Sequence, residues 1–299
     1  MGECLVSKGA RLEGHARTVV FALLRVSGLP LLARHLIQKH RLTVLLFHQQ
    51  SPGQFDRTLR ILKHRYNFVS LGEALDALEA GDLSRLPDRP LVLTFDDGRA
   101  SNASLIPVLT LHGVRPTVFI ATEVVGTRRH FWWTHLTAGE VTSFQALPDD
   151  ERRSSLSLRG LDPAREYDEP QALSAAELTA LASVADIEPH TRTHPVLTRC
   201  TPEQIRDEVE GSMLDVTALV GTRPRVFAYP NGVLSDEVAA LVAQCGLRFA
   251  VTTEPVLIDE HSDPMRLGRI FVRDGAGASE LIVFASGLQG ALKRLLRRA

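Results

Sequence analysis

The chain has 299 residues, of which 44% are hydrophobic and 23% are charged, and its formal net charge is −1. A chain of this length can bury a large core, and this charge balance lacks the basic surface of a nucleic-acid-binding protein, so we expect no nucleic-acid partner. The three cysteines are far apart and form no CxxC motif. They favour a reducing compartment.

Residues 1–41 are expected to form an amphipathic helical segment. Its apolar part, RTVVFALLRVSGLPLLARHL at 17–36, is interrupted by Arg25, Gly28 and Pro30. The uninterrupted apolar run is too short to span a bilayer, and no clean signal-peptide cleavage site follows it. The segment therefore lies either on a membrane surface or on the body of the protein. We expect a cytoplasmic protein or one peripheral on the cytoplasmic membrane, with secretion left open.

From residue 42 to 275, apolar strands alternate with amphipathic helices. The expected strands are 42–47, 90–95, 116–121, 185–189, 225–230 and 247–253. The expected helices are 53–66, 103–113, 175–183, 202–221 and 235–246. This alternation predicts a parallel sheet covered by helices, either doubly wound or closed into a barrel. In both architectures, reactive residues gather beyond the carboxyl ends of the strands.

One segment, 127–174, breaks the alternation. It is polar and contains the sequence HFWWTHL. We interpret it as an insertion on the face where the strands end, because long insertions in compact domains are often functional. Trp132 and Trp133 could stack on a sugar ring there. Because an adjacent pair more often has one ring in the core, we expect one of the two to line the cleft.

The chain ends in a segment, 276–299, that is expected to form a basic helix. Its last residues, GLQGALKRLLRRA, place lysine and arginine against leucine. Such a helix can lie on an anionic membrane. It could equally dock on the protein with its basic face in water.

Two neighbouring carboxylates, Asp96 and Asp97, follow the 90–95 strand in the sequence LTFDDG. Burying either one is costly without a partner. Successive side chains near a strand end point in different directions, so one carboxylate could bind a metal while the other handles a proton. The simpler alternative is a polar turn that caps the next helix.

Two histidines, His190 and His194, follow the 185–189 strand in the sequence PHTRTHP. A spacing of four can place both imidazoles on one side of a turn. Two histidines and a carboxylate are a ligand set typical of catalytic zinc, with the fourth position open. Isolated surface histidines are the alternative, but both this segment and DDG end strands that share one face of the expected fold.

A tight turn, Pro230–Gly232, follows the 225–230 strand in FAYPNG. Its exposed backbone N–H groups could stabilise an oxyanion. An ordinary turn between strand and helix would have the same sequence features.

TFDDG, HTRTHP and AYPNG, in this order, resemble the motifs of the polysaccharide deacetylases, the NodB-homology domain of carbohydrate esterase family 4. LLFH at 45–48 resembles the start of that domain, and the similarity covers about residues 42–275. The resemblance implies a distorted (β/α) barrel with fewer than eight strands. It also implies a divalent metal, best fitted by Zn²⁺, that is held by Asp97, His190 and His194. Cobalt, nickel or iron would suit the same ligands.

The resemblance further implies a reaction and its residues. Asp96 acts as general base on the attacking water, and the metal and the backbone N–H of Asn231 stabilise the oxyanion. Tyr229 and Pro230, together with the tryptophan pair, are assigned to substrate binding. The expected substrate is an N-acetylated polysaccharide or a glycolipid sugar, and the products are acetate and a free amine.

The chain lacks two groups of the family pattern at their usual positions, the arginine of the third motif and the histidine that acts as the acid. The arginine that many members carry in the third motif is replaced by Ala228, and the tyrosine before the glycine is replaced by Asn231. Arg269 could supply the missing charge from the last strand, although an ordinary ion-paired arginine is an equal alternative. The late histidine that supplies the acid has no clear equivalent, and His48 is the best-placed substitute, with packing as its alternative role.

These departures leave other functions open. A catalytically silent carbohydrate-binding relative is one alternative. An O-deacetylase or a deformylase of a lipid-linked sugar is another. The complete set of Asp96, Asp97, His190 and His194 favours an enzyme, because a binding module does not need a base beside a metal site.

Overall fold

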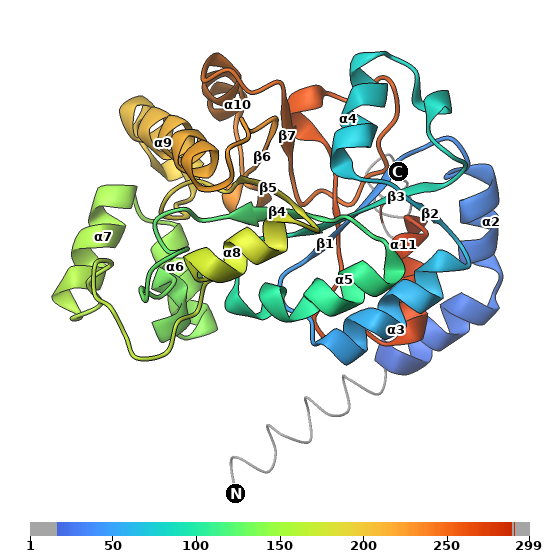
Figure 1. The fold of residues 1–299 in the computed structure, drawn as a ribbon, viewed down its shortest axis with the longest axis horizontal. Coiled ribbons are helices and arrows are strands. Elements are labelled where there is room, and N and C mark those ends of the chain that lie inside the picture. Colours follow the sequence, from blue (N-terminus) through green and yellow to red (C-terminus); the bar gives the residue numbers. More distant parts are fainter. Residues whose placement is uncertain (1–16, 289, 291–299) are drawn as a thin grey trace, which may run out of the picture.

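The structure, a computed structural model, describes residues 17–288 and residue 290. All paired strands within these residues are parallel, and helices lie between them along the chain (Figure 1). The strands are β1 (Thr43–Phe47), β2 (Asn67–Phe68), β3 (Pro90–Phe95), β4 (Thr117–Ile120), β5 (Asp186–Pro189), β6 (Val226–Ala228), β7 (Phe249–Val251) and β8 (Ile270–Phe271). The predicted parallel α/β fold is confirmed.

The strands form two parallel sheets. One ladder has the order β5-β4-β3-β1-β8, with β2 also paired to β3, and the other is β6-β7. A parallel bridge between Val251 and Leu267 joins the end of β7 to the segment just before β8. Within the described residues, the backbone ladders therefore leave the barrel open between β5 and β6.

Side chains span that opening. The carboxylate of Glu188, on β5, accepts backbone N–H groups of Arg225 and Val226 at 3.0 and 3.3 Å. His190 donates from Nδ1 to the carbonyl of Ala228 at 2.7 Å. Burial raises the pKa of Glu188 to about 8, although the hydrogen bonds from the backbone oppose the rise. A half-buried acid thus replaces the backbone pairing that a closed barrel would have at this point.

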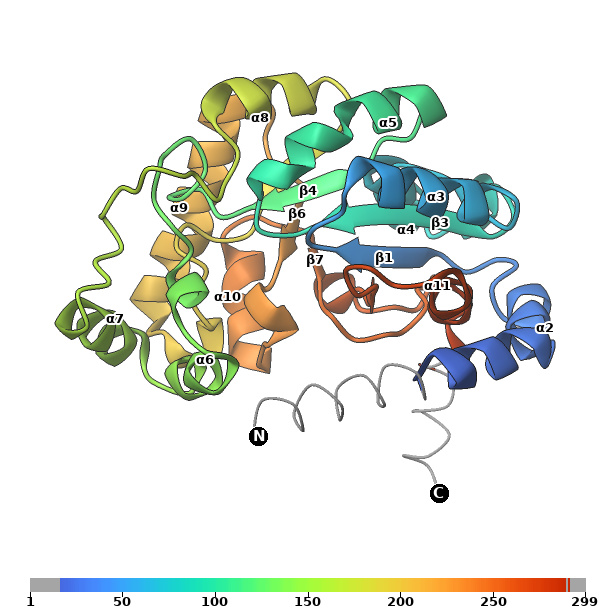
Figure 2. The same ribbon diagram turned by 90° about the horizontal axis from the view of Figure 1, so that it is seen from below.

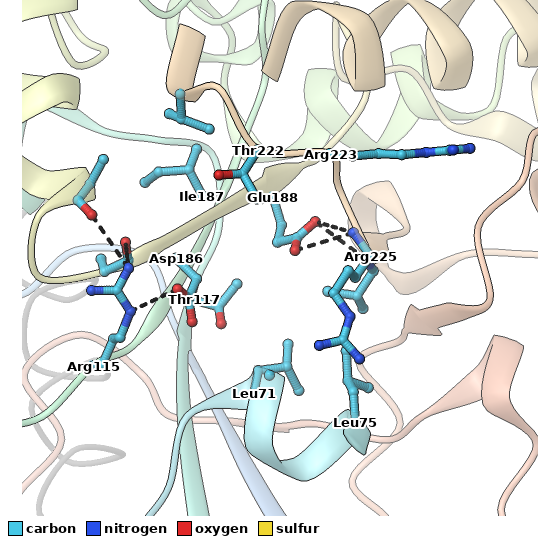
Figure 3. A pocket seen from close by; sticks show the side chains of 15 residues that line it. Leu71, Leu75, Arg115, Thr117, Asp186, Ile187, Glu188, Thr222, Arg223 and Arg225 are labelled. Carbon is cyan, nitrogen blue, oxygen red and sulfur yellow. Dashed lines mark hydrogen bonds and ion pairs between the residues drawn. The ribbon is translucent and has the colours of Figure 1, made fainter. Parts of the chain in front are cut away.

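A cavity of about 210 Å³ lies beside this opening, among the first residues of β4, β5 and β6 (Figure 3). Its wall includes Arg115, Thr117, Asp186, Glu188 and Arg225. None of the residues predicted to act in catalysis or to bind metal or substrate lines it. The cavity is therefore separate from the candidate functional site.

The helices begin and end where local sequence signals place them. They are α2 (Leu29–Leu36), α3 (Pro52–Lys63), α4 (Leu71–Glu79), α5 (Ile106–His112), α6 (Ala138–Gln145), α7 (Asp149–Leu158), α8 (Ala175–Ala182), α9 (Pro202–Val220), α10 (Asp236–Gln244) and α11 (Ala278–Ala285). Capping boxes start α3, α8 and α9, at Ser51, Ser174 and Thr201. The helix expected at 103–113 begins as a 3₁₀ turn, Ala100–Leu105, and continues as α5.

The main core lies around the central strands, where β1 and β3 are buried along their whole length. Figure 2 shows α3 and α11 flanking these strands. Phe47, Phe55 and Phe95 form a cluster of aromatic rings with centroids 5.3–5.8 Å apart. This packing holds the end of β3, and with it the two aspartates, in a fixed position.

The 127–174 segment contains more regular structure than its irregular sequence suggested. It holds a 3₁₀ turn, Trp132–His135, and the helices α6 and α7. A capping box between Thr137 and Glu140 starts α6. In α7, the buried carboxylate of Asp149 is bonded by Arg152 and Arg153 one turn later. These short-range interactions stabilise helices in a stretch whose hydrophobic pattern is weak.

The two terminal segments are only partly described. A helix, Arg17–Val26, precedes α2, and no single helix in the described residues is long and apolar enough to cross a membrane. These two helices together would have that length and composition, but they are bent by 57°. In the 276–299 segment, α11 is apolar and mostly buried, whereas the basic residues expected to form a helix lie outside the described residues.

Candidate metal centre and catalytic cleft

The end of β3 turns sharply at Asp97 and Gly98. Asp97 has φ of 76° and Gly98 has φ of 74°, so both lie in the left-handed region that most side chains avoid. A Cβ at position 98 would lie 2.8 Å from Cγ2 of Ile120. Glycine is therefore required for the backbone to pass this close to β4, and the turn directs Asp97 toward the end of β5.

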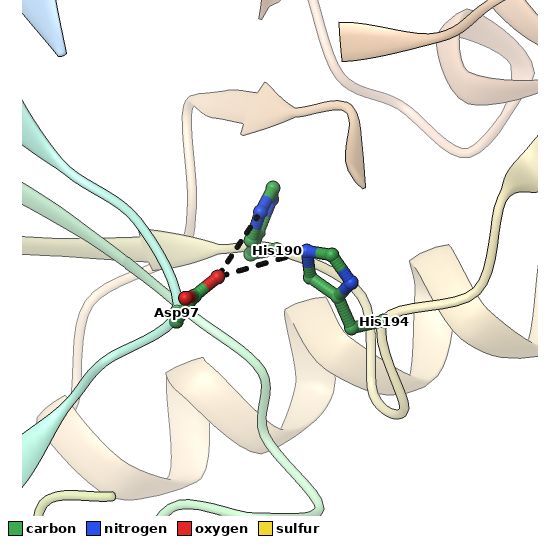
Figure 4. A group of neighbouring side chains, drawn as sticks. All are labelled: Asp97, His190 and His194. Carbon is green, nitrogen blue, oxygen red and sulfur yellow. Dashed lines mark ion pairs between the residues drawn. The ribbon is translucent and has the colours of Figure 1, made fainter. Parts of the chain in front are cut away.

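Asp97, His190 and His194 meet at one point (Figure 4). Oδ1 of Asp97 lies 4.0 Å from Nε2 of His190 and 3.6 Å from Nε2 of His194. All three side chains are buried, and their candidate ligand atoms lie within 4.8 Å of one another. These separations are too long for hydrogen bonds. They are near the ~3.4 Å expected between ligand atoms of one tetrahedral zinc ion.

The protonation of the two histidines also fits a metal. Because His190 donates from Nδ1 to Ala228, its Nε2 carries the lone pair that faces Asp97. Burial lowers the pKa of His190. Burial, with the neighbouring His190 as a second cause, lowers the pKa of His194 to about 3. Two neutral imidazoles and a carboxylate aimed at one point form a donor set suited to a divalent cation.

The other oxygen of Asp97 is held from outside the ligand set. Arg99 donates from Nε to Oδ2 at 2.9 Å, which leaves Oδ1 facing the histidines. Burial would raise the pKa of Asp97, but His48, His194 and Arg99 outweigh it and keep the pKa below its ordinary value. Arg99 was not predicted as a site residue. Its position two residues after Asp97 gave no signal that its side chain would turn back.

The loop that carries the histidines has an unusual backbone. Thr191 and His194 both have positive φ, at 66° and 57°. Glu208 on α9, which is 2% exposed, accepts the backbone N–H groups of Arg192 and Thr193 at 2.8 and 2.9 Å. It also accepts the Thr193 hydroxyl at 2.5 Å. Such bonds offset the cost of the left-handed residues and fix the orientation of the ligands.

Asp96 is paired with Arg269. The guanidinium donates from Nη1 to Oδ1 and from Nη2 to Oδ2, both at 2.7 Å. It also donates to the Thr252 carbonyl and the Thr94 hydroxyl. Burial raises the pKa of Asp96, but Arg269, followed by His190, more than reverses the effect and lowers it to about 2. Asp96 is thus expected to be ionised at neutral pH although it is buried.

A cavity of about 470 Å³ opens over these groups. Its lining includes His48, Asp96, Asp97, Trp133, His190, His194 and Asn231. The structure therefore brings together, around one cavity, predicted residues from five different stretches of the chain. His48 packs edge to face against Phe271 with ring centroids 5.4 Å apart, and the ring of Trp133 lies 4.4 Å from that of His194.

Three predicted substrate-binding residues are placed elsewhere. Trp132, Tyr229 and Pro230 are buried and are absent from the cavity lining. Trp132 donates from its indole N–H to the carbonyl of His194 at 3.1 Å, and Tyr229 packs in the core beside Phe227. The structure thus separates the tryptophan pair, because Trp133 faces the cavity and Trp132 bonds the loop that carries His190 and His194.

The insertion contributes residues to the cleft that sequence reasoning missed. Val141 and Gln145, on α6, line the cavity. Gln145 donates from Nε2 to Oδ1 of Asn231 at 3.1 Å, and so links the insertion to the turn after β6. Nothing in the sequence pairs these two residues, which are 86 positions apart.

Comparisons with known proteins identify the family of the chain. The Polysaccharide deacetylase family model matches residues 84–250, more than half of the chain. The chain is 21% identical over 248 residues to YxkH of Bacillus subtilis strain 168, whose own assignment as a polysaccharide deacetylase is provisional. That match covers 80% of this chain and 74% of YxkH.

Two solved structures have a similar fold. The deacetylase PplD of Streptococcus pyogenes, solved with acetate, has a TM-score of 0.61 and 18% identity, over 82% of this chain and 98% of PplD. The polysaccharide deacetylase BC0361 of Bacillus cereus has a TM-score of 0.60 and 17% identity, over 83% of this chain and 69% of BC0361. At these identities the likeness shows the fold alone.

Proposed function

The chain belongs to the polysaccharide deacetylase family, and from this premise we propose that it is a metal-dependent hydrolase that removes an N-acetyl group from a sugar of a polysaccharide or glycolipid. Family membership supports a hydrolase acting on acetylated carbohydrate. The observation that carries the finer proposal is the pairing of Asp96 with Arg269 directly beside the set of Asp97, His190 and His194.

We assign the metal to Asp97, His190 and His194, with zinc as the ion that best suits two imidazoles and a carboxylate. When bound, a divalent cation supplies a Lewis acid that polarises the acetyl carbonyl and makes a water more acidic. The remaining chemistry belongs to side chains of this chain that line the same cavity.

Asp96 is proposed as the general base. Its Oδ2 lies 3.8 Å from Nε2 of His190, so it faces the space between the metal ligands and the cavity. Arg269 holds the carboxylate ionised and fixes both of its oxygens. Asp96 can accept a proton from the water as the water attacks the carbonyl carbon, because each carboxylate oxygen has a second lone pair.

Two further groups complete the proposed reaction. The backbone N–H of Asn231 is proposed to donate to the oxyanion that develops when water adds to the carbonyl. His48 is proposed as the acid that protonates the amine as the carbon–nitrogen bond breaks. The products are acetate and a free amino sugar. Trp133 is proposed to stack on the sugar ring, since its side chain lines the cavity beside His194.

The test is acetate release from N-acetylglucosamine oligomers and from a crude cell-envelope glycan extract. Zinc-loaded wild type is compared with a chelated sample and with Asp96→Asn. We expect release that both perturbations abolish. Metal binding at one equivalent without acetate release from any substrate would favour the silent carbohydrate-binding alternative. Release only from O-acetylated sugars would favour the O-deacetylase. No metal binding would refute the assignment of the three ligands.

A further inference from the structure

The helix Arg17–Val26 and α2 carry an unusual concentration of exposed apolar side chains. Among the described residues, fifteen large hydrophobic side chains are exposed, and nine of them lie within residues 17–37. The nine are Val19, Val20, Leu23, Val26, Leu29, Leu31, Leu32, Leu36 and Ile37. We call them the N-terminal apolar surface. Exposed apolar residues scattered singly need no explanation, but a contiguous patch marks an interaction site.

Within residues 17–40 the charged side chains are all basic. Residues 17–40 contain no aspartate or glutamate, although the chain as a whole has a net charge of −1. Arg25, His35, Lys39 and His40 are exposed in the same stretch. Acids from other segments pair with some basic groups at its edge: Glu280 with Arg17, Asp88 with His40 and Asp259 with Arg41. Apolar side chains next to the exposed Arg25 and Lys39 fit a partner that offers both hydrocarbon and negative charge.

The surface is held in place by the body of the protein. Phe21 packs edge to face on Phe284 of α11, with ring centroids 5.2 Å apart, and Arg17 pairs with Glu280 at 2.5 Å. After α2, the side chain of Gln38 donates to Ala285 at 2.7 Å. Figure 2 shows both helices at the edge of the molecule next to α11. One side of this helix pair is thus packed, and the other presents the apolar residues outward.

We propose that the N-terminal apolar surface docks on the face of an anionic phospholipid bilayer, with both helices lying in the interface. A transmembrane span is disfavoured because the two helices are bent by 57° and Arg25 lies between the apolar groups. A second copy of the chain is the competing occupant, and the test below distinguishes it from a bilayer. The inference is independent of the proposed reaction.

The test is flotation of the full chain with vesicles of phosphatidylcholine alone or mixed equally with phosphatidylglycerol. The variants are Leu23→Glu and Val26→Glu, at positions 62% and 78% exposed. The matched control is Leu214→Glu, because Leu214 is 71% exposed but lies on α9, far along the chain. Identical thermal melts would show that all four proteins are folded.

We expect wild type and Leu214→Glu to float with the mixed vesicles, and more weakly at high salt. Leu23→Glu and Val26→Glu should each reduce the bound fraction by about tenfold or more. Wild type that stays in solution, or all three variants floating equally, would overturn the proposal. So would a wild-type dimer in the absence of vesicles that Leu23→Glu converts to a monomer, since a second copy would then be the partner. Acetate release from a soluble oligomer, measured in parallel, tests the proposed reaction separately.

Discussion

Replacing Arg269 by methionine would test the role assigned to the buried ion pair. Arg269 is 0% exposed, and its guanidinium bonds both oxygens of Asp96. Methionine keeps much of the side-chain volume but removes the charge and all of these donors. Asp96 would then be a buried carboxylate without its main partner. We expect the variant to fold with reduced stability and to lose the proposed base function.

The size of the effect follows from the charge left behind. Breaking a buried ion pair by removing one partner costs about 3–5 kcal/mol. Asp96 can avoid a buried, unpaired charge by binding a proton. At pH 7 this protonation costs about 4.4 kcal/mol, because the ordinary pKa is 3.8 and each pH unit is worth about 1.36 kcal/mol. We therefore expect a loss of about 3–4 kcal/mol at pH 7. For a chain this large, the melting temperature should fall by about 5–6 °C.

The pH dependence separates this explanation from simple loss of packing. In wild type, the lowered pKa of Asp96 stabilises the fold above pH 3.8, and this contribution is lost as pH falls toward about 2. In the variant, burial should instead raise the pKa of Asp96. Ionised Asp96 then destabilises the fold at neutral pH, and this destabilisation decreases as the carboxylate binds a proton at lower pH. At pH 5, protonation of Asp96 costs only about 1.6 kcal/mol. The stability difference should therefore narrow to about 2 kcal/mol or less.

The assay is urea unfolding of the chelated proteins at pH 7 and pH 5. The control is Arg248→Met, because Arg248 pairs with Glu79 but is mostly exposed, so its loss should cost less than ~1 kcal/mol at either pH. The double variant Asp96→Asn/Arg269→Met should be more stable than Arg269→Met alone. A difference from wild type that does not change with pH, together with additive effects in the double variant, would refute the reasoning.

Three further predictions concern the metal and the backbone that holds it. His194→Ala should weaken zinc binding by about a hundredfold or more, measured by competition with a chromophoric chelator; unchanged affinity would remove His194 from the ligand set. Glu208→Ala should weaken zinc binding by roughly 10–100-fold although Glu208 is not a proposed ligand, because the loop loses three hydrogen bonds. Glu208→Gln keeps one acceptor oxygen and should weaken zinc binding less. Equal zinc affinity of wild type and both variants would contradict this role. Gly98→Ala should unfold at clearly lower urea than Gly113→Ala, because both glycines have positive φ but only position 98 has Ile120 in the way; equal midpoints would show that β4 can yield.

The sequence predicted those parts of the site that are local. The 90–95 strand was recovered to the residue, because a buried parallel strand reads as a continuous apolar run. Asp96 and Asp97 follow directly from its end. The two histidines lie in one loop, and their spacing of four residues is enough to suggest that both bind the same metal ion. Each of these inferences needs only neighbouring residues and the rule that parallel strands end on one face.

The remaining parts depend on contacts between distant segments. Glu208 supports the histidine loop from a helix 15 residues further on, and nothing in its surroundings distinguishes it from a surface glutamate. Trp132 and Trp133 are adjacent, yet one is buried behind the loop and the other faces the cavity. A 3₁₀ turn at 132–135 directs the two side chains in different directions. So short a turn has no hydrophobic periodicity by which the sequence could predict it.

Arg269 shows how a site can keep a charge while moving it in the sequence. Asp96 and Arg269 are 173 residues apart, and they meet because β1 pairs with β3 on one side and with β8 on the other. In the family pattern the arginine belongs to the third motif, where this chain has Ala228, whose carbonyl instead accepts His190. A carboxylate inside a ring of parallel strands can be reached from several strand ends, so the electrostatic requirement fixes a place for the guanidinium and not a sequence position. The family match ends at residue 250, before Arg269. We therefore propose that Arg269 supplies from a different strand the charge that the third motif lacks in this chain.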